Sequence, residues 1–209
     1  INDEQQQAAS FIRDTDYIII TLGSAFYYET KDKNIVVANN HRVPSQWLEK
    51  KMMTPQAIYE CCAESIELIK TINPKAKIIF TISPVRHLRD GVIENNRSKA
   101  RLIQAVQQLC EQFNHAYYFP AYELVIDVLR DYRYYDIDFV HPNYLATQFV
   151  WEQFSKACIA PDCFPIMEAV KEITTAANHK TRFPETEAHK KFMSTYASKI
   201  EQLQVTYPF

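Results

Sequence analysis

Three apolar runs in the first two thirds of the chain predict buried strands. They cover residues 17–22, 77–82 and 116–120, and they are rich in β-branched and aromatic side chains. A continuous apolar run of this length is typical of a strand buried on both faces, as in a parallel sheet. A hairpin is also expected, because residues 25–29 and 34–38 alternate around a polar turn.

Helical periodicity fills the segments around these runs. Thr54 and Pro55 predict a helix start, with threonine as the N-cap and proline at the first helical position. Apolar residues at helical spacing mark the buried face of this helix: Ile58, Cys62, Ile66 and Ile69. Further helices are expected at residues 96–113, 143–157, 161–178 and 185–204, and residues 1–14 form a polar helix or tail.

The order strand, helix, strand, helix, strand indicates right-handed crossovers and a parallel sheet covered by helices. Ligands of such sheets bind outside the carboxyl ends of the strands. Gly23 and Ser24 follow the first run, residues 83–87 follow the second, and His141 comes after the third. We therefore expect these three segments to meet at one rim.

Composition removes several classes of function. The 209 residues carry a net charge of −2 at a pI of about 6.3, so neither nucleic acid nor an anionic membrane is expected as a partner. No apolar run approaches the length of a bilayer span. The only glycines are Gly23 and Gly91, which argues against the glycine-rich phosphate loops of P-loop and Rossmann proteins.

The five cysteines have no zinc-site spacing and include an adjacent pair. Reduced thiols in a cytoplasmic protein are the expectation, and neither a metal nor a cofactor is predicted.

Asp138 and His141 form the most informative pair. A histidine can take a proton from a serine while an aspartate fixes its tautomer and stabilises the imidazolium. The alternative is a helix N-cap with a surface histidine. Convergence of the three rim segments favours the catalytic interpretation.

The sequence resembles the GSCFA family, a distant branch of the SGNH (GDSL-type) hydrolases. The most specific matches are Ser-Pro-Val-Arg-His at residues 83–87 and Asp-Tyr-Arg at 131–133 followed by Asp-x-x-His-Pro at 138–142. Other matching stretches are 21–25, 37–41, 80–82, 95–99 and 118–123. The resemblance implies a three-layer α/β/α flavodoxin-like (SGNH hydrolase-like) fold with C-terminal helices.

The resemblance also implies residues that this chain does not contain. The naming motif Gly-Ser-Cys-Phe-Ala, which holds the nucleophilic serine, belongs before Ile1. We expect a partial α/β domain at residues 1–160 that lacks its N-terminal strand–helix units, and a helical extension at 161–209 that packs on it. Strand 17–22 should then have an open edge, through which the protein could form a homo-oligomer.

The sequence departs from its relatives at two places. Where SGNH enzymes carry a Gly-x-Asn-Asp block with the oxyanion-hole asparagine, this chain has Gly23, Ser24, Ala25 and Phe26. GSCFA proteins typically have a cysteine where this chain has Asn40.

Several rim residues are candidates for oxyanion or substrate contacts. Ser24 mimics the naming motif, but a backbone or hydroxyl contact suits it better than the role of nucleophile. Asn39 is a candidate for a substitute oxyanion donor, and Asn39 and His41 form either a pocket wall or a set of hydrogen bonds at the end of the hairpin. Arg86 and His87 either bind an anionic or hydroxylated substrate or hold the loop, with Arg86 paired to Asp131 or Glu123.

The sequence therefore predicts a serine esterase or acyl hydrolase with His141 as base and Asp138 as its orienter. Its substrate would be a small-molecule or carbohydrate ester, for example a sugar O-acetyl ester. A non-catalytic carbohydrate- or ligand-binding relative is the alternative, because the usual oxyanion asparagine is missing, and such a donor contributes about 3–4 kcal/mol in the transition state. A truncated gene product without its own function is the third hypothesis.

Overall fold

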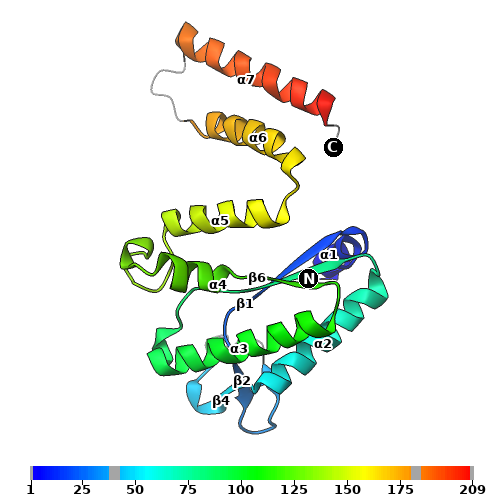
Figure 1. Ribbon diagram of the computed structural model, residues 1–209, viewed down its shortest axis with the longest axis vertical. Helices are drawn as coiled ribbons and strands as arrows, with labels where there is room; N and C mark the ends of the chain where they lie inside the picture. Colours follow the sequence, from blue (N-terminus) through cyan, green and yellow to red (C-terminus); the bar gives the residue numbers. More distant parts are fainter. Residues whose placement is uncertain (1, 38–42, 180–184, 208–209) are drawn as a thin grey trace. The chain divides into compact units, whose positions relative to one another are not determined.

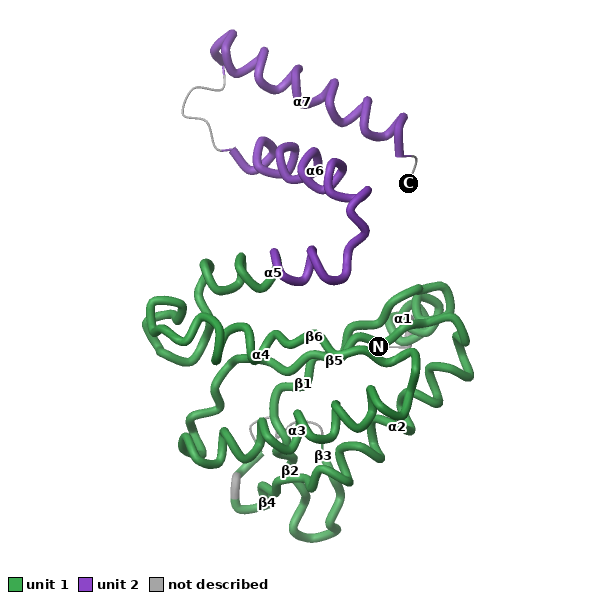
Figure 2. The backbone as a smooth tube through the Cα atoms, in the orientation of Figure 1, with its two compact units in different colours: residues 1–151 green, residues 152–209 purple. Residues whose placement is uncertain are grey.

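The computed structural model describes residues 2–37, 43–179 and 185–207 (Figure 1). The chain divides into two compact units, Ile1–Trp151 and Glu152–Phe209, and the boundary falls within helix α5 (Tyr144–Cys158) (Figure 2). The boundary after Trp151 thus lies nine residues before the one expected at 160. Packing of the C-terminal helices on the α/β domain stays a prediction.

A three-stranded parallel sheet organises the first unit. Its strands are β1 (Tyr17–Leu22), β5 (Lys77–Ile82) and β6 (Ala116–Phe119), in the order β1-β5-β6. All three apolar runs therefore form the strands expected of them. Helices flank the sheet, as in a flavodoxin-like α/β/α fold.

Two long helices cover one face of this sheet, α2 (Pro55–Ile72) and α3 (Val92–Gln112), which lie side by side in Figure 1. The hydroxyl of Thr54 caps α2 by accepting a hydrogen bond from the backbone N–H of Ala57, as the sequence predicts. The helices and strands enclose one buried apolar cluster, which includes Ile58, Ile66, Ile78, Phe80, Ile82, Leu102, Val106 and Leu109. The periodic apolar positions of the sequence thus form the core.

The burial of strand β1 differs from the sequence prediction. Its residues alternate between exposed and half-buried, and Tyr17 and Ile19 are 53% and 54% exposed. The prediction of burial on both faces is therefore wrong for this strand. The physical reason is its position: β1 lies at the end of the sheet, with β5 as its only partner among the described strands, whereas β5 lies between two neighbours. The expected open edge is confirmed, and pairing of that edge with a second copy stays a prediction.

A second, antiparallel sheet has the order β3-β2-β4. The predicted hairpin forms from β2 (Phe26–Thr30) and β3 (Val36–Val37). Strand β4 (Leu48–Met52) completes the sheet, although the sequence did not predict it. Its segment carries three consecutive charged residues, so it has no apolar run, and its pairing with β2 comes from tertiary structure.

The remaining elements join these layers. Helix α1 (Asn2–Asp14) precedes β1, and helix α3 begins four residues earlier than predicted. After β6 come the short helix α4 (Ala121–Glu123), a π-helical segment (Leu124–Leu129) and a 3-10 turn (Tyr132–Tyr134). Other 3-10 turns cover Ser45–Trp47, Leu88–Asp90 and Pro161–Cys163.

The second unit contains the two C-terminal helices that the sequence predicts, α6 (Phe164–Ala177) and α7 (Glu187–Thr206). An ion pair joins them, with Lys199 Nζ 2.6 Å from a carboxylate oxygen of Glu172. The ring of Phe192 on α7 packs near that of His179, which follows α6.

Candidate functional site

A single lysine ties together the carboxyl ends of β1 and β5. Lys99, on α3, donates hydrogen bonds from Nζ to the carbonyl oxygens of Gly23 and Ser83, each at 2.6 Å. Because these two residues directly follow the two strands, the expected meeting of the two segments at one rim is confirmed.

The ammonium of Lys99 is buried, and the residue is only 1% exposed. Burial lowers the pKa of Lys99 from 10.5 to about 8, since the charged form loses its water. Among the described residues Lys99 forms no ion pair, and its charge is met by the two carbonyl dipoles and by the ring of Tyr122, 5.9 Å from Nζ. An isolated buried charge is expensive, so this lysine has a specific role at the rim.

The turn after β1 uses its polar groups within the fold. The backbone N–H of Ala25 donates to the buried hydroxyl of Ser98 at 2.7 Å, and that of Phe26 makes a long contact of 3.4 Å to the hydroxyl of Ser24. In the described parts of the chain, Ser24 makes no hydrogen bond to His141. The polar atoms of this turn therefore support the backbone.

His87 lies beside this turn. A Cβ built on Gly23 would be 3.8 Å from Nε2 of His87, and the backbone N–H of His87 donates to Oδ1 of Asn95 at 2.8 Å. Its pKa is lowered, first by burial and then by the charges of Lys99 and Lys50, which outweigh the opposing effect of Asp90. These surroundings therefore favour the neutral form of the imidazole beside the ends of the strands.

The Asp138–His141 loop is the best-defined part of the candidate site. One carboxylate oxygen of Asp138 lies 2.6 Å from Nδ1 of His141, and the other accepts backbone N–H bonds from Val140 (2.9 Å) and His141 (3.0 Å). Between them, Phe139 adopts a left-handed conformation at φ 55°. The same aspartate thus closes the loop and orients the imidazole.

These contacts set the charge of Asp138. Its pKa is lowered from 3.8 to about 2, chiefly by the backbone N–H of His141, then by the imidazole and by the N–H of Val140. The side chains of His141 and Asp138 are 59% and 44% exposed. With Nδ1 facing the carboxylate, the favoured neutral tautomer carries its hydrogen there, and Nε2 is left to accept a proton.

Arg86 connects the segment after β5 to this loop. Its backbone N–H donates to the carbonyl of Val140 and its Nη1 to the carbonyl of Phe139, both at 3.3 Å. The guanidinium lies 4.3 Å from the ring centre of Tyr135 and 5.3 Å from that of Tyr132. Hydrogen bonds therefore link all three rim segments expected from the sequence.

The carboxylates considered as partners of Arg86 are engaged elsewhere. Asp131 pairs with Arg133 at 2.9 Å, and Glu123 accepts a hydrogen bond from the hydroxyl of Tyr118 at 2.7 Å. Arg86 does hold the loop, but it does so through the backbone carbonyls of Phe139 and Val140. Burial raises the pKa of the Tyr135 hydroxyl and the neighbouring guanidinium of Arg86 opposes this rise, so part of the guanidinium also interacts with Tyr135.

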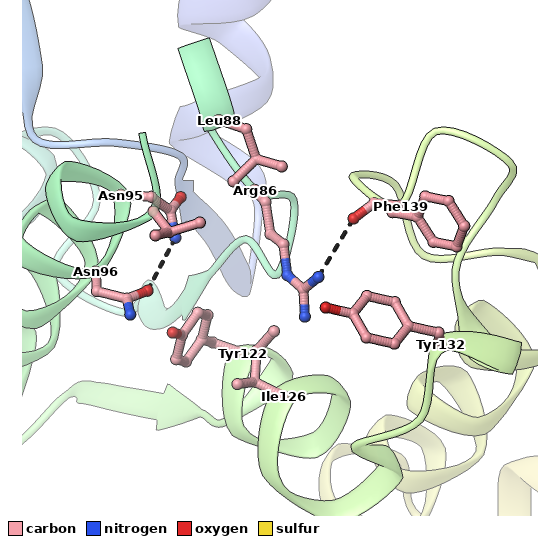
Figure 3. Close-up of a pocket in the computed structure, with 9 residues that line it drawn as sticks. Arg86, Leu88, Asn95, Asn96, Tyr122, Ile126, Tyr132 and Phe139 are labelled. Atoms are coloured by element: carbon pink, nitrogen blue, oxygen red, sulfur yellow. Dashed lines mark hydrogen bonds between the residues drawn. The ribbon is translucent and has the colours of Figure 1, made fainter. Parts of the chain in front are cut away.

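A cleft of about 700 Å³ opens beside the loop (Figure 3). Its walls come from the segment after β5, the first turns of α3, the helical segment after β6 and the loop itself. The lining residues are Arg86, Leu88, Val92, Asn95, Asn96, Tyr122, Ile126, Tyr132 and Phe139. Phe139 thus lines the cleft from the stretch between Asp138 and His141.

A polar cluster on α3 was not predicted from the sequence. Asn95, Ser98 and Lys99 are each at most 5% exposed and support the rim through the contacts described above. A signal for them exists in the sequence, because they occupy the same helical face as Leu102 and Val106. Polar residues on the buried face of a helix need partners, and here the partners are rim atoms. Asn39 and His41 lie outside the described residues.

The described residues contain no group of three or more His, Cys, Asp or Glu side chains arranged to hold a metal ion. Their cysteines, Cys61, Cys62, Cys110, Cys158 and Cys163, are free thiols. None of the helices in the described ranges combines the length and hydropathy needed to cross a membrane.

Comparison with known families agrees with the resemblance seen in the sequence. Residues 1–154 match the model of the GSCFA family, and residues 170–209 match that of the GSCFA domain protein C-terminal domain. No curated protein matches the sequence. Since the first match covers the whole α/β unit and more than half of the sequence, the chain belongs to the GSCFA family.

Proposed function

We propose that this chain carries the proton-transfer apparatus of an SGNH-like serine esterase or acyl hydrolase, with His141 as general base and Asp138 as its orienter. The observation that supports this most strongly is the 2.6 Å contact between Nδ1 of His141 and the carboxylate of Asp138. The second carboxylate oxygen is fixed by two backbone N–H groups, so the imidazole has one preferred orientation.

In the proposed reaction, Nε2 of His141 takes the proton of an attacking serine as its oxygen bonds to the acyl carbon of an ester. The imidazolium, stabilised by Asp138, then gives this proton to the departing alcohol as the ester C–O bond breaks. His141 next takes a proton from water, which attacks the acyl-enzyme, and returns it to the serine as the acid leaves. The serine belongs to a segment outside the described residues, and the substrate is an acyl ester, for example a carbohydrate O-acetyl ester.

Turnover of 4-nitrophenyl acetate by the native protein that contains this sequence tests the proposal. The expected result is hydrolysis that falls at least about 10³-fold in His141→Ala, since the base is lost. His179→Ala, which removes an exposed imidazole of the second unit, should retain the wild-type kcat. A His141→Ala variant with near-native kcat would assign the pair to loop structure.

A second candidate is a non-catalytic ligand-binding relative. One observation favours it: the N–H of Ala25, at the place where relatives supply oxyanion donors, is already bonded to Ser98. An oxyanion hole needs N–H groups aimed at the position of the developing charge. A native protein that binds ligand in the cleft but turns over no acyl ester would favour this alternative.

A further inference from the structure

We infer that the cleft beside the Asp138–His141 loop is a binding site for small monoanionic carboxylates with a flat apolar body. In this assignment the carboxylate bonds to the guanidinium of Arg86, and the body lies among the rings of Tyr122, Tyr132 and Phe139. The inference concerns binding, and it holds whether or not the protein hydrolyses esters.

The lining of the cleft has one charged side chain. Arg86 is accompanied by two amides and by apolar or aromatic residues, and no Asp or Glu lines the cleft. Ligand sites commonly combine apolar walls with a small number of polar groups that fix orientation. Here the only charged group in the lining is the guanidinium cation of Arg86, so the cleft prefers anionic ligands.

Arg86 is held in place before any ligand arrives. Nη1 is bonded to the carbonyl of Phe139, and the guanidinium stacks on the buried ring of Tyr135. Figure 3 shows the side chain reaching into the cleft towards Tyr122 and Tyr132. A guanidinium has five N–H donors in a rigid fork, so several remain for the two oxygens of a carboxylate. Because the fork is already oriented, little entropy is lost on binding.

No carboxylate of the described chain competes for this fork. Asp131 is paired with Arg133, Glu123 accepts from Tyr118, and Arg86 forms no ion pair within the described ranges. Asp127 and Glu123 lie near Tyr122, where they add to the effect of burial in raising its pKa. A ligand therefore places its anionic end at Arg86 and its uncharged body towards Tyr122.

The number of cationic side chains that can reach a ligand in the cleft determines which ligand charge the cleft prefers. Nζ of Lys99 lies 5.9 Å from the ring centre of Tyr122, but Lys99 is buried and already donates to two carbonyls. A single guanidinium suits a monoanion, whereas a phosphate dianion would call for further donors. The amides of Asn95 and Asn96 already bond to each other on the opposite wall, and that of Asn95 also accepts the N–H of His87.

The test is an NMR titration of the isotope-labelled chain with 4-hydroxybenzoate and with its neutral isostere 4-hydroxybenzamide. Wild type should bind the carboxylate at least about tenfold more tightly than the amide, as expected for charge-assisted hydrogen bonds. The shifts should be centred on Arg86, Tyr122 and Tyr132. Equal affinities, or shifts elsewhere, would overturn the assignment without any variant being made.

Variants sharpen the result. In Arg86→Gln the ratio of the affinity for 4-hydroxybenzoate to that for 4-hydroxybenzamide should fall to about one. Arg89→Gln removes the same charge from an exposed position outside the lining of the cleft, and it should keep the wild-type ratio. A preference that persists in a folded Arg86→Gln variant would contradict the assignment. Since 4-hydroxybenzoate is not an ester, these outcomes are independent of any esterase activity.

Discussion

Two turns at the same rim use their polar atoms in opposite ways. The turn after β1, Gly23 to Ala25, directs a carbonyl to Lys99 and an N–H to Ser98, so it is fastened to the core. The Asp138–His141 loop directs its N–H groups to its own aspartate and leaves the imidazole exposed. The turn that resembles the naming motif of the family thus uses its polar atoms to hold the backbone, whereas the Asp138–His141 loop leaves an oriented imidazole exposed to solvent.

The largest expected effect concerns Asp138. In the native protein, Asp138→Asn should lower kcat by about 10³- to 10⁴-fold, because the amide cannot stabilise the imidazolium and favours the wrong tautomer. The measurement is hydrolysis of 4-nitrophenyl acetate, with circular dichroism to confirm the fold. Asp131→Asn, which breaks an exposed ion pair with Arg133 instead, is the matched control and should retain activity. Equal losses in the two variants would mean that the loss of activity does not come from the contact between Asp138 and His141.

Lys99→Met should reduce the free energy of unfolding by about 1–3 kcal/mol. Two rim carbonyls lose their donor, and this cost is partly offset because an ammonium no longer has to be buried. Urea denaturation measures the change. Lys75→Met, at an exposed position, should stay within about 0.5 kcal/mol of wild type. If Lys99→Met and Lys75→Met have the same free energy of unfolding, the β1 turn is not anchored by Lys99.

The hydrogen bonds of Asp138 should make the stability of the protein depend on pH. The pKa of Asp138 in the folded chain, about 2, is below that of an unfolded aspartate, so the contribution of this group is present above about pH 4 and is lost as the pH falls towards 2. Urea midpoints measured from pH 6 to pH 2.5 should show the advantage of wild type over Asp138→Asn shrinking in that window. A difference that does not change with pH would contradict the hydrogen bonds assigned to Asp138.

The smallest expected effect is at Gly23. An added Cβ would meet only Nε2 of His87 at an ordinary 3.8 Å, so Gly23→Ala should change stability by no more than about 0.5 kcal/mol. Gly91, at φ 86° and ψ 163°, provides the contrast: its backbone region is essentially reserved for glycine, and Gly91→Ala should cost about 1–3 kcal/mol. Thermal denaturation of both variants checks the difference. A large loss at Gly23 would mean that the turn needs glycine for its own conformation.

The sequence predicted which residues form the strands of the parallel sheet better than it predicted how deeply each strand is buried. The runs of β1 and β5 are almost interchangeable as patterns, yet β5 is buried whereas Ile19 of β1 is half exposed. Apolar content specifies a strand, but its place in the sheet depends on which neighbours pair with it. Strand β4 escaped prediction for the converse reason, because pairing with β2 makes a strand of a charged segment.

The candidate site was predictable where its chemistry is local. Asp138 and His141 are three residues apart, so their spacing alone suggested a contact. Lys99 is 76 residues from Gly23, and its role depends on how α3 lies against the strand ends. The cleft likewise combines separate segments of the chain, and only folding shows that Phe139 and Arg86 line the same cleft.

Long-range ¹H–¹⁵N NMR of the imidazole of His141, in wild type and in Asp138→Asn, tests the proposed role of the pair most directly. At a pH where His141 is neutral, wild type should carry its hydrogen on Nδ1, leaving Nε2 as the base, and Asp138→Asn should lose this preference. A wild-type ring with its hydrogen on Nε2, or an equal mixture of tautomers in both proteins, would contradict Asp138 as the orienter of a catalytic base.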